Sequence, residues 1–216
     1  MKRIFTLLIC LIYLATQNAS LAQKEDKADQ ILNKLSKKIK GLNSFYLEYS
    51  ATVKNESLDQ NDSFTGKGWV KNNKYFATYG DNTIISNGLK TWSILNKDKE
   101  VYESNNSDDD EIINPKKLMT LWESGFKNKY NKAEVIGKES VDVIDLYPKQ
   151  PDKSSYTSIT ISVAKTANEL RKALVKYNDG TVMTYSITKF TSNPDVKDTK
   201  FVYDKKNYPG YKLIKN

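Results

Sequence analysis

The first strong pattern along the chain is a run of apolar residues at helical spacing. Within residues 29–42, apolar side chains recur three and four positions apart, and lysines fill the other face. This spacing predicts an amphipathic helix that ends near Gly41. The apolar positions are Ile31, Leu32, Leu35, Ile39 and Leu42. The pattern fits a helix packed on a core, and it also fits a movable cover over a cavity.

From residue 45 the apolar period changes to two, which is typical of a half-buried strand. Short strands with tight connections then follow one another as far as residue 103, and Asn87-Gly88 fits a type I′ hairpin turn. Gly66 and Gly68 lie inside one of these strands and suggest a bend or a bulge. This half of the chain is therefore predicted to be an antiparallel meander. One face of its first strand carries Phe45, Leu47, Tyr49, Ala51 and Val53.

A second helix is predicted after the meander. Asn114-Pro115 resembles an N-cap followed by proline at the first helical position. An apolar stripe then follows, and polar loops flank the segment, so the helix fits either core packing or a lid inserted into the sheet. The stripe consists of Leu118, Met119, Leu121, Trp122 and Phe126.

The second half of the chain returns to strands, and its last predicted strand covers residues 201–203. Residues 170–177 have helical spacing, yet Asn178-Asp179-Gly180 is a hairpin turn that needs a strand before it, so we interpret them as a strand. The total is nine to eleven strands, and a sheet of that size must curl or close. The predicted fold is mainly β with helices: a curved antiparallel sheet forms an unclosed half-barrel, covered by the two helices. The concave side of such a sheet leaves an apolar cavity.

The N-terminus has the pattern of a secretory signal peptide. Lys2 and Arg3 precede an apolar run over residues 4–14, and Ser20-Leu21-Ala22 offers a cleavage site. The run is shorter than the roughly 20 residues of a membrane span, although an uncleaved anchor is the alternative. We expect residues 1–22 to be the signal peptide and residues 23–216 to form a single exported domain.

The composition excludes several classes of function. The chain has no histidine, and its only cysteine is Cys10 in the predicted signal peptide, so we expect no disulfide, metal site or histidine-based catalysis. Without Lys2 and Arg3, the chain has 32 basic and 26 acidic residues. This modest excess of positive charge forms no basic stripe of the kind that binds nucleic acid. A carboxylate-based glycosidase is the remaining enzyme hypothesis. Its candidate acids, in 108–111 and 142–145, fit a solvated surface better.

Several short segments between residues 31 and 214 carry a family resemblance by their order and spacing. In this order they resemble the periplasmic outer-membrane lipoprotein carrier family, LolA. The segments are Leu42-Asn-Ser-Phe45, Gly66-Lys-Gly-Trp-Val70-Lys, Ile84-Ile-Ser-Asn-Gly88 with Trp92, Pro115-x-x-Leu118, Leu146-Tyr-Pro-Lys149, Asp179-Gly180 and Phe201-Val-Tyr203.

The resemblance implies a non-enzymatic periplasmic carrier without a cofactor. It would take acylated lipoproteins from an inner-membrane ABC transporter, shield their acyl chains and deliver them to an outer-membrane acceptor. We expect such a carrier to be a monomer. A lipid-binding sensor or regulator on the same fold is the alternative function.

The predicted lipid-binding lining combines positions from both helices and from the sheet, and ordinary core packing explains each of them equally well. Phe76 matches a family position inside the cavity. Family members commonly carry an arginine that holds the empty lid shut where this chain has Asn72, so an amide replaces the guanidinium there. The predicted lining residues are Leu35, Ile39, Phe45, Leu47, Tyr49, Phe76, Trp92, Ile94, Leu118, Leu121 and Trp122.

Overall fold

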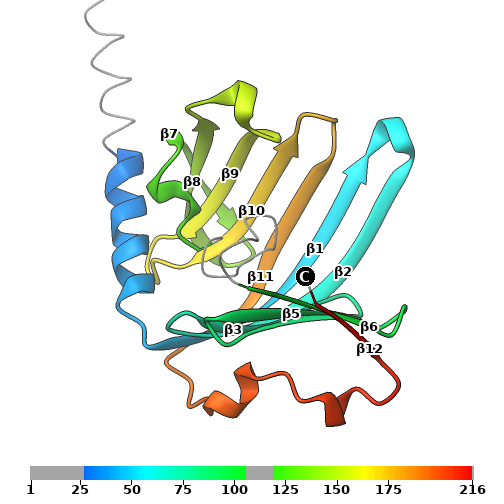
Figure 1. Ribbon diagram of the computed structural model, residues 1–216. Helices are drawn as coiled ribbons and strands as arrows, with labels where there is room; N and C mark the ends of the chain where they lie inside the picture. Colours follow the sequence, from blue (N-terminus) through cyan, green and yellow to red (C-terminus); the bar gives the residue numbers. More distant parts are fainter. Residues whose placement is uncertain (1–26, 106–118, 216) are drawn as a thin grey trace, which may run out of the picture.

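The computed structural model describes residues 27–105 and 119–215, with one α-helix at residues 27–40 and twelve strands in a single sheet (Figure 1). The strands are β1 (Ser44–Asn55), β2 (Gln60–Lys71), β3 (Lys74–Tyr79), β4 (Asn82–Ser86), β5 (Lys90–Leu95), β6 (Glu100–Asn105), β7 (Phe126–Ile136), β8 (Glu139–Pro148), β9 (Tyr156–Ala164), β10 (Leu170–Tyr177), β11 (Val182–Ser192) and β12 (Lys212–Lys215). The 3₁₀ helices are η1 (Glu56–Leu58), η2 (Leu121–Glu123), η3 (Pro151–Lys153), η4 (Asp198–Phe201) and η5 (Lys205–Asn207).

The sheet is long and curved, and its two edge strands do not meet. Its strand order is β12-β6-β5-β4-β3-β2-β1-β11-β10-β9-β8-β7, and every neighbouring pair is antiparallel except β12 with β6. The edge strands β7 and β12 are not paired with each other, so the described strands do not close into a barrel. Figure 1 shows the layer of β3 to β6 continuing through β2, β1 and β11 into β10, β9, β8 and β7, which bend away from that layer, with the helix along one side. The predicted half-barrel with an N-terminal helix is confirmed.

The predicted second lid helix is not seen among the described residues. Its first part, up to Leu118, lies outside them, and residues 119–125 contain only the three-residue 3₁₀ helix η2. Gly125 then adopts a left-handed φ of 81°, and Phe126 already begins β7. The apolar stripe therefore reflects burial of Met119, Trp122 and Phe126 against the sheet rather than a continuous helix.

Of the local predictions, one strand and one hairpin are confirmed, whereas the turn type and the last strand are wrong. The strand interpretation of residues 170–177 is confirmed by β10. The hairpin at Asn87-Gly88 is confirmed, but it is not type I′: within the turn only Gly88 has a positive φ, 91°, and the amide of Asn87 bonds the carbonyl of Lys90 at 3.2 Å. A positive φ at the first central residue is the feature of a type II′ turn. The predicted strand over residues 201–203 is wrong, because Phe201 ends η4 and the last strand is β12.

Apolar side chains are buried on both faces of the sheet. The concave face and the helix share one cluster, which includes Leu35, Leu47 and Ile161. On the other face, Ile85, Trp92, Ile94 and Val101 form a second cluster, covered by Tyr203, Tyr208 and Tyr211 of the C-terminal segment. In Figure 1 this segment crosses β3 to β6 on the side opposite to β7 to β10.

Gly66 permits a close approach between strands rather than a bulge. The register of β1 with β2 runs without a shift, and the irregularity lies between Glu48 and Tyr49 in the pairing of β1 with β11. A Cβ at Gly66 would lie 2.3 Å from the carbonyl oxygen of Thr78 and 2.4 Å from the Tyr49 ring, whereas one at Gly68 would find its nearest neighbour at 3.8 Å.

These contacts predict different results for two matched substitutions. Gly66→Ala should lower the free energy of unfolding by about 1–3 kcal/mol, because backbone and ring must move apart. Gly68→Ala, two residues along the same strand, should change it by less than about 0.5 kcal/mol. Urea unfolding of both variants tests this, and equal values would contradict the close approach.

Candidate ligand-binding cavity

A cavity of about 460 Å³ opens on the concave face of the sheet. Its volume lies within the range of about 300–1,000 Å³ that is usual for small-ligand sites. The described wall consists of Leu47, Tyr49, Phe64, Gly68, Ala77, Tyr79, Ile84, Ser93, Met119, Trp122, Leu146, Ile159, Ile161, Leu170, Ala173, Val175, Met183, Tyr185 and Ile187. None of these side chains is charged, so the wall suits hydrocarbon and not an ion.

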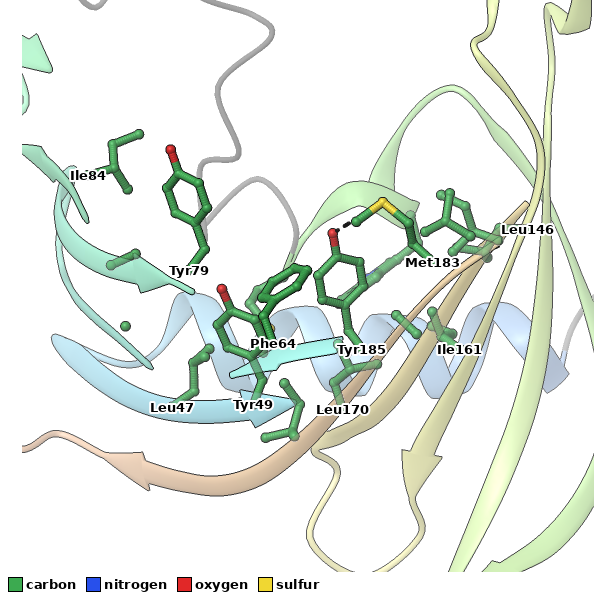
Figure 2. Close-up of a pocket in the computed structure, with 18 of the residues that line it drawn as sticks. Leu47, Tyr49, Phe64, Tyr79, Ile84, Leu146, Ile161, Leu170, Met183 and Tyr185 are labelled. Carbon is green, nitrogen blue, oxygen red and sulfur yellow. Dashed lines mark hydrogen bonds between the residues drawn. The ribbon is translucent and has the colours of Figure 1, made fainter. Parts of the chain in front are cut away.

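Aromatic side chains lie in the middle of the cavity wall. Figure 2 shows Tyr49, Phe64 and Tyr185 between the Leu47 and Ile84 side and the Leu146 and Ile161 side. The Tyr49 and Tyr185 rings lie 6.0 Å apart, and the Tyr49 hydroxyl donates to the carbonyl of Thr78 at 3.0 Å. Burial, and next the neighbouring Tyr79, raise the pKa of Tyr49 to about 12, so this phenol stays neutral at physiological pH.

The structure brings only some of the predicted lining residues to the cavity. Leu47, Tyr49 and Trp122 lie in its wall. Leu35, Ile39 and Phe45 are buried in the adjoining core but are not part of the wall. Leu118 and the side chain of Leu121 lie outside the described residues. Contact of any of these residues with a ligand stays a prediction.

Phe76, Trp92 and Ile94 differ from the prediction because they lie on the opposite face. Trp92 and Ile94 belong to the convex cluster, against which Phe76 packs. Successive side chains of a strand point to opposite faces, so Ala77 and Ser93 face the cavity in their place. Both faces of these strands are apolar, which is why the alternation alone could not tell which one is concave.

Sequence reasoning missed most of the wall that the second half of the chain contributes. Strands β8 to β11 supply nine of the wall residues, and their alternating pattern was the available signal. The missed residues there are Leu146, Ile159, Ile161, Leu170, Ala173, Val175, Met183, Tyr185 and Ile187. Placing them on the concave face requires the pairing of β1 with β11, which joins the two halves of the sheet.

The N-terminal helix is fixed beside the cavity by burial and by ion pairs. Lys38 donates to Glu169 at 2.7 Å and to the carbonyl of Ala167 at 2.7 Å. Arg171 bonds the other oxygen of Glu169 at 2.7 Å and holds Glu139 through two hydrogen bonds of 2.5 and 3.0 Å. This network ties the helix to the turn between β9 and β10 and, through Arg171, to Glu139 at the start of β8.

A second polar contact joins the helix to the cavity wall. The indole nitrogen of Trp122 donates to the Ser36 hydroxyl at 2.7 Å, and both side chains are buried. Asn72, the position of the family arginine, instead lies in the turn between β2 and β3 with a φ of 55°, a conformation that asparagine tolerates well. The contacts of Trp122 and Lys38 therefore join the helix to η2 and to the turn between β9 and β10.

Glu169 makes the helix contact dependent on pH. Burial opposes its ionisation, but the hydrogen bonds from Lys38 and Arg171 outweigh burial and lower the pKa below the ordinary 4.5. This stabilisation is fully present above pH 4.5 and is lost as the pH falls through the lower folded-state pKa.

Glu169→Gln should therefore lower the free energy of unfolding at pH 7 by about 0.5–1 kcal/mol, as for a partly exposed ion pair. At pH 3 the difference from wild type should shrink. Urea unfolding at the two pH values measures it. Glu56→Gln, at an exposed acid, is the control, and a Glu169→Gln difference that does not vary with pH would contradict the assignment.

The candidate acids of the glycosidase hypothesis do not form a described site. Residues 108–111 lie outside the described part of the chain. Asp142 and Asp145 are three positions apart in β8, which places them on opposite faces of the strand. Asp145 accepts hydrogen bonds from Thr160 at 2.7 Å and Asn131 at 2.8 Å, and Asp142 accepts one from Tyr130 at 3.1 Å. Their contacts are those of structural carboxylates.

The fold is an open half-barrel around a cavity whose described wall is apolar and uncharged. The family model described as "Outer membrane lipoprotein carrier protein LolA" matches residues 40–204, and the chain belongs to this family. The family consists of periplasmic carrier proteins and not of enzymes. A comparison with curated proteins finds no match. In the described part of the chain, no helix has the length and apolarity that a bilayer crossing requires.

Solved structures share the fold at low sequence identity. An uncharacterized conserved protein from Thermus thermophilus is 8% identical with a TM-score of 0.56, over 88% of this chain and 99% of that one. LprF from Mycobacterium bovis is 13% identical with a TM-score of 0.50, over 80% and 95%. The LolA superfamily protein NE2245 from Nitrosomonas europaea is 13% identical with a TM-score of 0.42, over 82% and 97%. At these identities the structures with TM-scores of 0.56 and 0.50 show a likeness of fold alone.

Proposed function

We propose that this protein is a periplasmic carrier that binds the acyl chains of lipoproteins in its concave cavity. It takes them from an inner-membrane ABC transporter and passes them to an outer-membrane acceptor. The observation that carries the proposal is the uncharged apolar wall on the concave face, in a chain of the LolA family. Residues 1–22 would direct export and residues 23–216 would form the carrier domain.

The energetics explain why a lipoprotein needs such a cavity. Each buried methylene is worth about 0.8 kcal/mol, so exposing one chain of ~15 methylenes to water costs on the order of 12 kcal/mol. A carrier has to offset only part of this cost, because the cargo must be released. A half-open cavity with few polar groups meets this requirement better than a tight pocket that recognises one shape.

Release of a lipoprotein from membranes tests the proposal. Vesicles that contain the transporter and an acylated lipoprotein are incubated with the purified protein and ATP, and the supernatant is fractionated by size. We expect a soluble one-to-one complex with the acylated lipoprotein and none with a variant lacking the acylated cysteine. Failure to extract the lipoprotein would reject the carrier role. Copurification with a periplasmic protein domain instead would favour the sensor or regulator.

A further inference from the structure

The cavity wall contains hydroxyl groups that the protein itself does not fully use. The hydroxyl of Tyr49 is already bonded to Thr78. Tyr79 makes no hydrogen bond through its hydroxyl to any other described residue, and the Tyr185 hydroxyl reaches only the Met183 sulfur, at 3.8 Å. Ser93 is a further wall hydroxyl, but its short side chain keeps it close to the sheet.

These two phenols are donors without a good acceptor among the described residues. A buried Tyr hydroxyl usually has a hydrogen-bond partner, and a thioether sulfur is a weak acceptor. Burial raises the pKa of Tyr79, and burial together with the nearby tyrosines raises that of Tyr185, so both carry their proton at physiological pH. A donor left unpaired in an apolar wall favours a ligand that brings an acceptor.

The two hydroxyls lie on either side of the central aromatic group. Tyr79 in β3 lies opposite Gly66 in β2, and the Tyr49 ring lies over Gly66. On its other side, the Tyr49 ring contacts the ring of Tyr185. The three tyrosines therefore form a row across β3, β1 and β11. Figure 2 shows the Tyr185 hydroxyl directed at Met183, and Tyr79 apart from it on the Ile84 side.

We propose that Tyr79 and Tyr185, each on its own side of the central aromatic group, are donors for the carbonyl oxygen of a bound acyl group, so that a chain bound on either side gains one hydrogen bond. The cavity then prefers chains attached through an ester or amide over alkyl chains of equal length, because only the acyl group supplies an acceptor inside an otherwise apolar wall. A charged head group finds no charged partner in the described wall, so it stays at the opening. This inference rests on the proposed function, since it names the chemistry that selects the carrier's ligand.

Two matched lipids test this preference. Monopalmitoylglycerol and hexadecylglycerol share the glycerol head and the chain length, and they differ in the carbonyl. Their affinities are measured by displacement of a fluorescent fatty acid. Wild type should bind the ester roughly three- to tenfold more tightly than the ether, the ratio expected for one net hydrogen bond.

Removing the two hydroxyls should abolish the preference for the ester and leave binding of the alkyl chain intact. The double variant Tyr79→Phe and Tyr185→Phe should bind the ester as weakly as the ether, with the ether affinity unchanged. Tyr147→Phe, at an exposed tyrosine of β8, is the control and should keep the wild-type ratio. Equal affinities in wild type, or a preference that survives in the double variant, would overturn the inference and leave the carrier role standing. If neither lipid binds, both proposals fail.

Discussion

Ala173→Trp is expected to lower the affinity for a fluorescent fatty acid at least about a hundredfold while the protein stays folded. Ala173 lies in the cavity wall on β10, between Ile161 of β9 and Tyr185 of β11. An indole at this position occupies the space that a chain would fill. Displacing only about four methylenes costs ~3 kcal/mol, which corresponds to that factor.

Ala133→Trp provides the matched control for this prediction. Ala133 is exposed on the edge strand β7, so the same side chain is added to a strand without entering the cavity. Its affinity should equal that of wild type, and circular dichroism and thermal melting establish that both variants are folded. Unchanged binding by folded Ala173→Trp would mean that the ligand sits elsewhere, and the proposed function would then lose its main support.

Leu35→Ala is expected to lower the free energy of unfolding by about 2–5 kcal/mol. Leu35 is fully buried at 0% exposure, where the N-terminal helix meets the concave core. Truncating a buried leucine removes its transfer free energy and leaves a cavity. Urea denaturation with an unchanged m-value would measure the loss.

Lys34→Ala, at the exposed neighbouring position, separates packing from helix propensity. Alanine is at least as good a helix former as lysine, so this control should change stability by less than about 0.5 kcal/mol. A loss below about 1 kcal/mol for Leu35→Ala would show that the helix is only loosely seated. That outcome would favour the movable cover over the packed helix, the two interpretations that its spacing left open.

Local patterns were sufficient where a single segment carries the whole signal. The spacing of Leu35 and Ile39 predicts the helix, and Gly41 follows its last turn in the structure. The turn at Asn178-Asp179-Gly180 correctly decided between helix and strand for the segment before it. The stripe around Trp122 misled, because apolar residues at helical spacing can also be buried by a short turn that packs on a sheet.

The cavity wall depended on contacts between distant segments. Leu47 and Tyr49 were predicted because polar residues alternate with the apolar ones in their strand. Phe76 and Trp92 were misplaced because residues 203–211 cover the convex face and make both faces apolar. Tyr79 and Tyr185 are more than a hundred positions apart, and only the strands between them bring them to one wall.

The sequence by itself determined that this chain forms a large, curved antiparallel sheet with an amphipathic helix at its start, because periodicity and turn residues act over a few neighbours. Only the tertiary structure decided which face is concave, how the helix is held and which hydroxyls face the cavity. Those features depend on strand order and on what covers each face, and both are set by pairings between residues far apart in the chain.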